Sequence, residues 1–174
     1  MKIAIIGYSG SGKSTLARQL GAYYHAPVIH LDALYWKPGW QHCSRAELAA
    51  QTEDILDHQT SWVIDGNYSA AAYERRMREA DQILYLDFPR YLCLFRALKR
   101  RVCYHGKTRP DMAEGCAEKF DWEFFRWLMW DGRTKQIRAR RAALEAQYPE
   151  KLLHWKRPKQ VEAYLAQCKK EVTP

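Results

Sequence analysis

Lys13, Ser14 and Thr15 follow a run of glycines near the start of the chain. Together with Gly7 they give the spacing G-x-x-x-x-G-K-S, which is typical of a loop that binds nucleotide phosphates. Glycine adopts backbone conformations closed to other residues, so successive N–H groups of such a loop can point at one anion. We expect the cofactor-binding residues to be Gly7, Ser9, Gly10, Ser11, Gly12, Lys13, Ser14 and Thr15.

The residues at the end of this motif predict a triphosphate and a metal ion. Lys13 would reach the β- and γ-phosphates, and the Ser14 hydroxyl would bind Mg²⁺. The β-branched run at 3–6 predicts a strand before the loop, and the residues after Lys13 predict a helix whose N-terminus faces the phosphates. Because the motif requires this context, we expect ATP and Mg²⁺ as cofactors.

Aspartates end three further predicted strands. Asp65 follows an apolar run as a Walker-B acid does, and would hold Mg²⁺ through water or bind the acceptor. Asp32 would receive a hydroxyl proton or orient an acceptor. For both acids a helix cap or turn remains the structural alternative. We interpret Asp87 as a plain N-cap before a helix with Pro89 in its first turn, and leave it out of the catalytic set.

Arginines concentrate in one part of the chain, where planar, bidentate phosphate recognition is the expected use. Between Arg90 and Arg141 lie ten arginines and four lysines against six acidic residues. Arg96 and Arg100 are four apart and so share a helix face. We expect Arg96, Arg100 and Arg109 to close over the transferred group. The alternatives are a solvated basic face, or salt bridges to Glu114, Glu118 or Glu123.

The elements that must position these residues alternate along the chain. Short apolar runs at 3–6, 27–31, 62–64, 82–86 and 151–155 predict five strands, separated by helical patterns. Such alternation predicts a single α/β domain over 1–174, with a parallel sheet covered on both faces and ligands beyond the carboxyl ends of the strands. The pattern weakens at 101–120, where we expect a mobile lid. The helical region 120–148 is expected to break near 131–132.

Bulk properties exclude several classes of protein. No apolar run approaches the roughly 20 residues of a membrane span. We expect no signal peptide, because the first predicted strand begins at residue 3, and we expect a cytoplasmic protein from the five scattered cysteines. Cys103, His105 and Cys116 lack a fourth metal ligand at sensible spacing. The net charge of +8 permits nucleic-acid binding, but no motif for it is present.

Several segments resemble known families. The glycine loop with Arg96 and Arg100 is similar to the adenylate kinase and shikimate kinase group of P-loop phosphotransferases. Segments 30–40, 62–68, 85–90, 109–112 and 115–122 resemble more closely the DNA topology modulation (FlaR-related) proteins, which are adenylate-kinase-like. The resemblance implies ATP binding and a three-layer fold of the nucleoside-monophosphate-kinase type, with strand order 2-3-1-4-5. It implies no defined reaction.

The sequence therefore predicts a kinase that moves the γ-phosphoryl of ATP to a small acceptor such as a nucleoside, a nucleotide or another hydroxylated metabolite. The alternative is a nucleotide-regulated DNA-associated protein without small-molecule kinase activity. Arg45 is a candidate for holding an acceptor phosphate, and at least one of Tyr35, Trp36 and Trp40 is expected to line a pocket. Arg126 and Arg133 are candidates for later lid arginines. The acceptor and the oligomeric state stay open.

Overall fold

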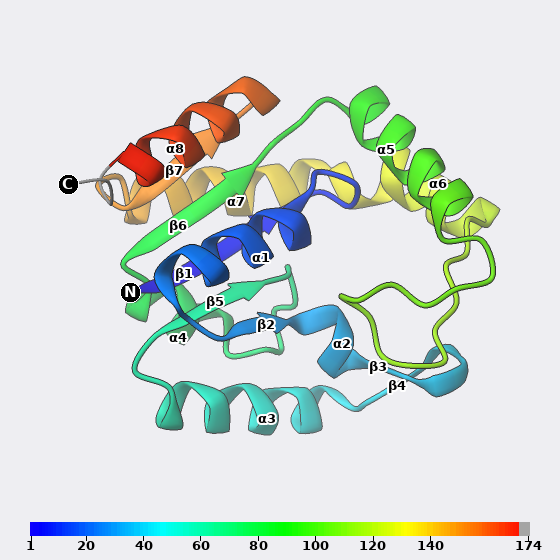
Figure 1. Ribbon diagram of the computed structural model, residues 1–174, viewed down its shortest axis with the longest axis horizontal. Helices are drawn as coiled ribbons and strands as arrows, with labels where there is room; N and C mark the ends of the chain where they lie inside the picture. Colours follow the sequence, from blue (N-terminus) through cyan, green and yellow to red (C-terminus); the bar gives the residue numbers. More distant parts are fainter. Residues whose placement is uncertain (171–174) are drawn as a thin grey trace.

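A five-stranded parallel sheet forms the centre of the protein (Figure 1). The computed structural model describes residues 1–170. Its sheet has the order β2-β5-β1-β6-β7, which is 2-3-1-4-5 when these five strands are counted along the chain, so the predicted order is confirmed. The strands are β1 (Lys2–Gly7), β2 (Val28–His30), β5 (Trp62–Asp65), β6 (Gln82–Leu86) and β7 (Leu152–Trp155).

The strand register brings the predicted site residues to one edge of the sheet. In β1, Ile5 pairs with Asp65 of β5, and Gly7 pairs with Leu86 of β6. His30 at the end of β2 pairs with the same Asp65. Because all these pairings are parallel, the carboxyl ends of the strands meet beside the glycine loop.

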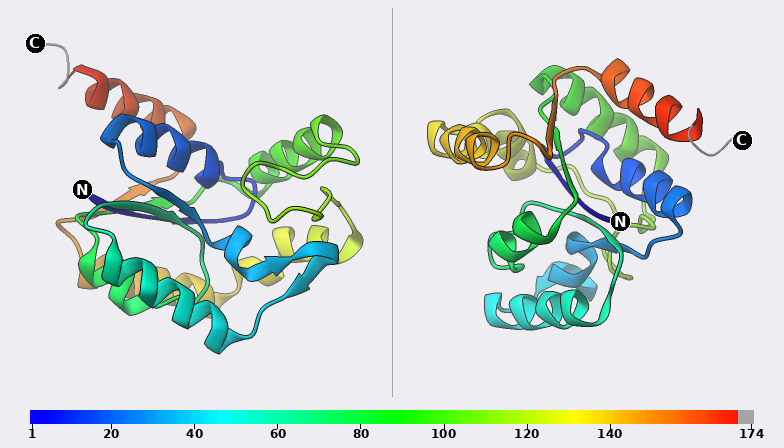
Figure 2. Two further views of the ribbon diagram at one scale, coloured as in Figure 1. Left: turned by 60° about the horizontal axis from the view of Figure 1, so that its bottom comes forward. Right: turned by 90° about the vertical axis from the view of Figure 1, so that its left-hand side faces the viewer.

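Helices cover both faces of the sheet and give three layers (Figure 2). One face carries α1 (Lys13–Tyr24), α5 (Arg90–Cys103) and α8 (Pro158–Lys170). The other carries α3 (Arg45–His58), α4 (Tyr73–Glu79) and α7 (Lys135–Gln147). The short α6 (Trp122–Met129) packs beside α5, and a 3₁₀ turn at Asp131–Arg133 separates it from α7 as predicted.

Alternate residues of the strands supply the two halves of the core. Ile3 and Ile5 pack under α1 and α5, while Ala4 and Ile6 pack under α3 and α4. All four are fully buried. A strand buried on both faces needs apolar residues at every position, which explains why β1 is a continuous apolar run.

A small hairpin that the sequence did not predict lies between β2 and α3. The helix α2 (Leu31–Tyr35) leads into β3 (Trp36–Lys37), a 3₁₀ turn at Pro38–Trp40 and β4 (Gln41–His42). The two short strands are antiparallel, with Trp36 opposite His42. The Pro-Gly pair at the turn lets the chain reverse within three residues.

Two helix starts differ in how they are capped. At α3 the N–H of Glu47 donates to the Ser44 hydroxyl over 3.1 Å. The interpretation of Asp87 as an N-cap is wrong. Pro89 occupies the N-cap position of α5, and the Asp87 carboxylate lies 3.0 Å from Nε2 of His154 on β7.

The segment 104–121 has little regular structure, although the helix before it, α5, continues to Cys103. Isolated bridges join Thr108 to Ala117 and His105 to Glu118. The segment lies against the β3–β4 hairpin (Figure 1). There the Trp40 indole donates to the carbonyl of Ala117 over 3.2 Å. None of the helices within residues 1–170 could cross a membrane.

Candidate functional site

The glycine loop joins the end of β1 to the start of α1. Gly12 is the N-cap of α1. Because glycine has no side chain, it offers no acceptor to the N–H groups of the first helical turn. Gly10 has φ +74°, and a Cβ there would lie 2.4 Å from the carbonyl oxygen of Cys93. Only glycine fits this position, because a side chain would meet both backbone strain and a clash. The loop therefore has the geometry of an anion cradle.

Lys13 is folded back on this loop. Its Nζ donates to the carbonyl of Tyr8 over 3.1 Å. Burial lowers the pKa of Lys13, while the nearby carboxylates of Asp32 and Asp65 oppose that shift in part. This half-buried ammonium group can exchange the carbonyl for a phosphate oxygen.

Ser14, Asp65 and His30 form a connected group beside Lys13. The Ser14 hydroxyl donates to Oδ2 of Asp65 over 2.8 Å, and Nδ1 of His30 lies 2.5 Å from Oδ1 of the same carboxylate. Burial works against the charged form of His30, but the hydrogen bond with Asp65 prevails and raises its pKa.

The oxygens of Ser14 and Asp65 fit a magnesium ion. Mg²⁺ prefers oxygen ligands and is usually held by one or two protein groups together with substrate phosphates. No cluster of three or more His, Cys, Asp or Glu side chains suited to a metal occurs within residues 1–170. Two oxygen ligands from the protein suit a Mg²⁺ ion whose other ligands are phosphate oxygens and water.

Asp32 lies in the first turn of α2, where His30 and not Asp32 is the N-cap. Oδ1 of Asp32 accepts a hydrogen bond from the Tyr68 hydroxyl over 2.7 Å. Burial raises the pKa of Tyr68, and the charge of Asp32 raises it further, so the phenol stays a donor. The carboxylate is thereby held in place by a partner far along the chain, as an acceptor-orienting group would need.

A cavity of about 570 Å³ brings most of the predicted residues together. Its lining contains the loop from Ser9 to Thr15, together with Asp32, Arg96, Arg100 and Arg109. Gly7 and Asp65 lie behind this lining. The sequence reasoning missed seven further polar or reactive lining residues, namely Arg18, Gln19, Lys99, Cys103, Tyr104, Asp111 and Glu162. The helical positions of Arg18 on α1 and Lys99 on α5 were the signal that could have found two of them.

The three predicted arginines have different partners. Nη1 of Arg96 donates to the carbonyl of Ser11 over 2.9 Å. Nε of Arg100 donates to Oε1 of Glu118 over 2.7 Å, and Nε of Arg109 lies 2.6 Å from Oε2 of Glu118. The salt-bridge alternative therefore holds for Arg100 and Arg109, while both also line the cavity. Of the predicted acidic partners only Glu118 is used by them, and Glu114 and Glu123 are exposed.

Asp111 is a buried carboxylate that the sequence did not single out. Oδ2 of Asp111 accepts from Nη1 of Arg109 over 2.7 Å, and Oδ1 lies 3.8 Å from Nη1 of Arg18. Burial works to raise the pKa of Asp111, but the charge of Arg109 and the nearby Ser14 hydroxyl hold it below its usual value. Asp111 thus joins the arginines to the residue expected to bind metal.

Asn67 fixes the start of the loop to the neighbouring strand end. Its Oδ1 accepts from the N–H of Gly7 over 3.1 Å, and its Nδ2 donates to the carbonyl of Gly7 over 2.5 Å. Arg141 of α7 donates to the same Oδ1 over 2.7 Å. The contacts explain why Gly7 lies behind the cavity wall as a structural part of the loop.

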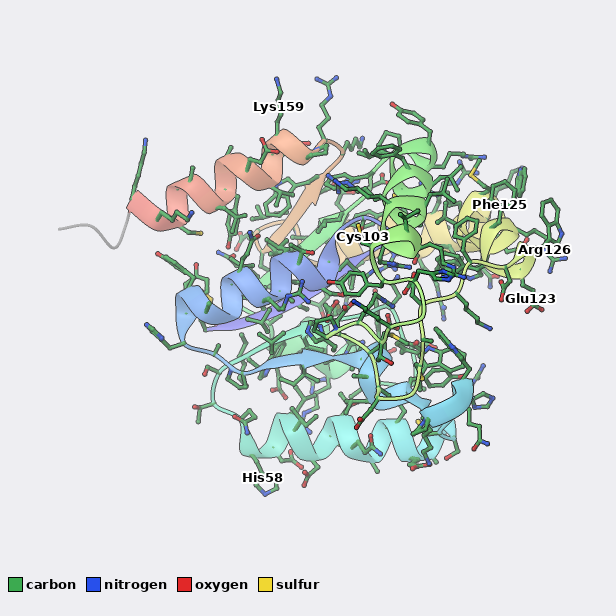
Figure 3. The ribbon with its side chains drawn as sticks, turned by 45° about the vertical axis from the view of Figure 1, so that its right-hand side comes forward. His58, Cys103, Glu123, Phe125, Arg126 and Lys159 are labelled. Atoms are coloured by element: carbon green, nitrogen blue, oxygen red, sulfur yellow. The ribbon has the colours of Figure 1, made fainter. Side chains whose placement is uncertain are left out.

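The remaining candidates lie outside the cavity lining. Arg45 is the exposed first residue of α3. Arg126 pairs with Asp131 at the outer end of α6, where Figure 3 shows it pointing away from the body of the protein. Arg133 stacks on the ring of Tyr8 at 3.6 Å and donates to a carbonyl of the backbone, so it packs against the loop from outside.

Comparison with known proteins supports the fold. A scan against protein-family models and a search of curated proteins each found no match. Among solved structures the chain is similar to the shikimate kinase from Acinetobacter baumannii in complex with shikimate, with 13% identity and a TM-score of 0.52 over 99% of this chain and 95% of that one. It is also similar to the shikimate kinase from Bacteroides thetaiotaomicron, with 16% identity and a TM-score of 0.50 over 100% and 99%.

At such identities these similarities concern the fold alone. The fold is the α/β fold of these shikimate kinases, with the five-stranded parallel sheet that the sequence predicted. Neither solved structure supports the resemblance to DNA topology modulation proteins.

Proposed function

We propose that the protein is an ATP-dependent kinase that transfers the γ-phosphoryl group to a small hydroxylated acceptor. The observation that carries the proposal is the convergence of the glycine loop, Lys13, Asp32 and three arginines on one cavity. Phosphoryl transfer needs positioning and charge stabilisation more than covalent chemistry, and these residue types supply both. A cavity of about 570 Å³ also suits a small ligand.

The residues of the site have distinct roles in this proposal. The loop N–H groups and Lys13 bind the phosphates, and Ser14 and Asp65 hold Mg²⁺. When bound, the metal ion neutralises charge on the phosphate oxygens. Arg96, Arg100 and Arg109 stabilise the charge of the transferred group, and the segment 104–121 acts as a lid that excludes water.

The acceptor hydroxyl is expected beside Asp32. This carboxylate lies within the electrostatic reach of Lys13, so a group bound next to it faces the phosphates. Tyr35 packs against Tyr68 with ring centroids 4.7 Å apart, but none of Tyr35, Trp36 and Trp40 lines the cavity, so the expectation of an aromatic pocket wall is not met there. The shikimate kinase of similar fold was solved in complex with shikimate, which is a hydroxylated small molecule. Shikimate is therefore one compound to test as the acceptor.

The DNA-associated alternative is not favoured by any observation on residues 1–170. Arginines that bind a nucleic-acid backbone are displayed on a surface. Arg100 and Arg109 instead turn inward, where their side chains are 23% and 10% exposed and pair with Glu118. We keep this alternative as an outcome of the test.

The test is a transfer assay with γ-labelled ATP, Mg²⁺ and a panel of nucleosides, nucleotides, shikimate and other hydroxylated metabolites. We expect the label to move to one acceptor class, and Lys13→Ala to reduce transfer by orders of magnitude while the melting temperature stays near that of the wild type. The exposed Lys135 gives the matched control, Lys135→Ala, which should transfer normally. Equal rates in wild type and Lys13→Ala, or salt-sensitive DNA binding with no transfer, would overturn the proposal.

A further inference from the structure

We propose that Glu118 is a positioning residue that holds Arg100 and Arg109 from behind and aims both guanidinium groups at the terminal phosphate of a bound nucleotide. The inference rests on the proposed function for the identity of the ligand. It assigns a role to a residue that lies outside the cavity lining.

The first support is the position of Glu118 relative to the cavity. Arg100 and Arg109 line the cavity, whereas Glu118 does not. The side chain of Glu118 is 3% exposed, so its carboxylate is screened from the cavity and from solvent. The carboxylate is therefore placed to hold the arginines and not to meet the ligand itself.

The second support is the part of each arginine that the carboxylate contacts. Oε1 of Glu118 accepts from Nε of Arg100 over 2.7 Å. Oε2 lies 2.6 Å from Nε of Arg109, an ion pair outside hydrogen-bond geometry. Both contacts use the inner Nε nitrogen, while the terminal nitrogens are the ones that bind phosphate as a fork. Within residues 1–170, no protein group hydrogen-bonds to the terminal nitrogens of Arg100. Nη1 of Arg109 donates to Asp111 over 2.7 Å, so Nη2 is the terminal nitrogen of Arg109 that remains for phosphate.

The third support is electrostatic. Two like charges from separate parts of the chain meet here, Arg100 at the end of α5 and Arg109 in the irregular segment. Burial lowers the pKa of Arg100 most, the neighbouring charge of Arg109 lowers it further, and Glu118 works in the opposite direction. Without the carboxylate between them, the two guanidinium groups would repel each other and separate.

The backbone around Glu118 is itself fixed. The N–H of Glu118 donates to the carbonyl of Lys107 over 3.0 Å, and His105 forms a bridge with the same residue. On the other side, the Cys116 thiol donates to the carbonyl of Lys37 in the β3–β4 hairpin. The carboxylate thus has a defined origin from which to place two long, flexible side chains.

The experiment compares nucleotide affinities, measured by calorimetry with Mg²⁺ and without any acceptor. The ligands are ADP and a non-hydrolysable triphosphate analogue. We expect Glu118→Gln to weaken binding of the triphosphate analogue by roughly 10-fold to 100-fold, because aligned charge-assisted hydrogen bonds to its terminal phosphate are lost. Binding of ADP should weaken far less. A merely structural role would weaken both ligands alike, so the ratio of the two affinities is the deciding quantity.

Three controls sharpen the result. Glu114→Gln removes an exposed carboxyl from the same segment and should leave the ratio unchanged. Glu118→Asp keeps the negative charge but moves it one methylene farther from the arginines. If Glu118→Gln unfolds below the assay temperature, the two affinities are compared in Glu118→Asp instead. In a variant with Arg100→Gln and Arg109→Gln, adding Glu118→Gln should change the ratio no further.

Several outcomes would overturn the inference. These are equal weakening of both ligands, tighter triphosphate binding after Glu118→Gln, a persistent effect in the double arginine variant, or a wild type that does not prefer the triphosphate. Tighter binding would mean that Glu118 competes with phosphate. The affinity measurement contains no acceptor and is therefore independent of the transfer assay. A protein that binds the triphosphate more tightly than ADP but transfers its γ-phosphoryl group to no acceptor would refute the proposed function and leave this inference standing.

Discussion

Asparagine in place of Asp65 should separate metal binding from folding. Asp65 is 4% exposed and contacts Ser14 and His30 with its two oxygens. Asparagine has nearly the same shape and can keep both contacts in neutral form. The substitution therefore removes the negative charge that the metal needs while it leaves the packing of β5 in place.

The expected loss of stability follows from these two contacts. A hydrogen bond to a charged group contributes about 1.5–3 kcal/mol, and a neutral one about 0.5–1.5 kcal/mol. Two such exchanges cost about 2–3 kcal/mol together, and relief from burying a charge returns part of that. We expect a net loss of about 1–2 kcal/mol, which lowers the melting temperature of a chain of this length by about 2–8 °C.

The assay is a Mg²⁺ titration in which nucleotide affinity is measured at each Mg²⁺ concentration. Once an acceptor is known, the transfer rate is measured in the same way. We expect Asp65→Asn to raise the half-maximal Mg²⁺ concentration at least about tenfold, as the loss of a group that holds a metal or its water does. Asp87 supplies the matched control, because it also follows a strand of the sheet and also contacts a histidine, His154 at 3.0 Å. Asp87→Asn should leave the Mg²⁺ dependence unchanged. An unchanged Mg²⁺ dependence in Asp65→Asn, or the same shift in both variants, would refute the reasoning.

Other substitutions and one labelling experiment test the rest of the site. Asp32→Asn should lower kcat/KM for the acceptor by about 10²–10⁴ with nucleotide affinity near wild type, because proton transfer and orientation are lost; unchanged turnover would return Asp32 to a structural role. Gly115→Ala should destabilise the protein more than Gly106→Ala in thermal melts, since both glycines have positive φ but only the first would place a Cβ 3.2 Å from Pro38; equal losses would contradict docking of the segment on the hairpin. Cys103 is exposed while the other four cysteines are buried, and it lines the cavity (Figure 3). ATP with Mg²⁺ should therefore slow its alkylation in a thiol-labelling time course, and an unaffected rate would place the nucleotide elsewhere.

The glycine loop could be predicted because its parts are contiguous. The glycines, Lys13 and Ser14 lie within one short stretch, between a strand and a helix whose patterns are local. The strand-end acids Asp32 and Asp65 followed from a general property of parallel sheets, in which carboxyl ends share an edge. The structure agrees with both inferences, and the resemblance to P-loop kinases also predicted the strand order.

The prediction for Asp87 failed because its partner comes from another strand. Asp-Phe-Pro-Arg reads locally as the start of a helix, and local hydrogen bonding is what a sequence pattern describes. In the fold, β7 lies beside β6 and brings His154 to the carboxylate, 67 residues along the chain. A cap and a cross-strand contact compete for the same oxygens, and only the sheet decides between them.

By itself the sequence determined the place of the glycine loop between a strand and a helix, since a loop motif is a property of consecutive residues. Only the tertiary structure decided which charges surround it. Asp111 beside Ser14, and Glu118 between Arg100 and Arg109, come from a segment without periodicity, where spacing carries no information on direction. That segment takes its course from long-range contacts with the β3–β4 hairpin, which exist only once the chain has folded.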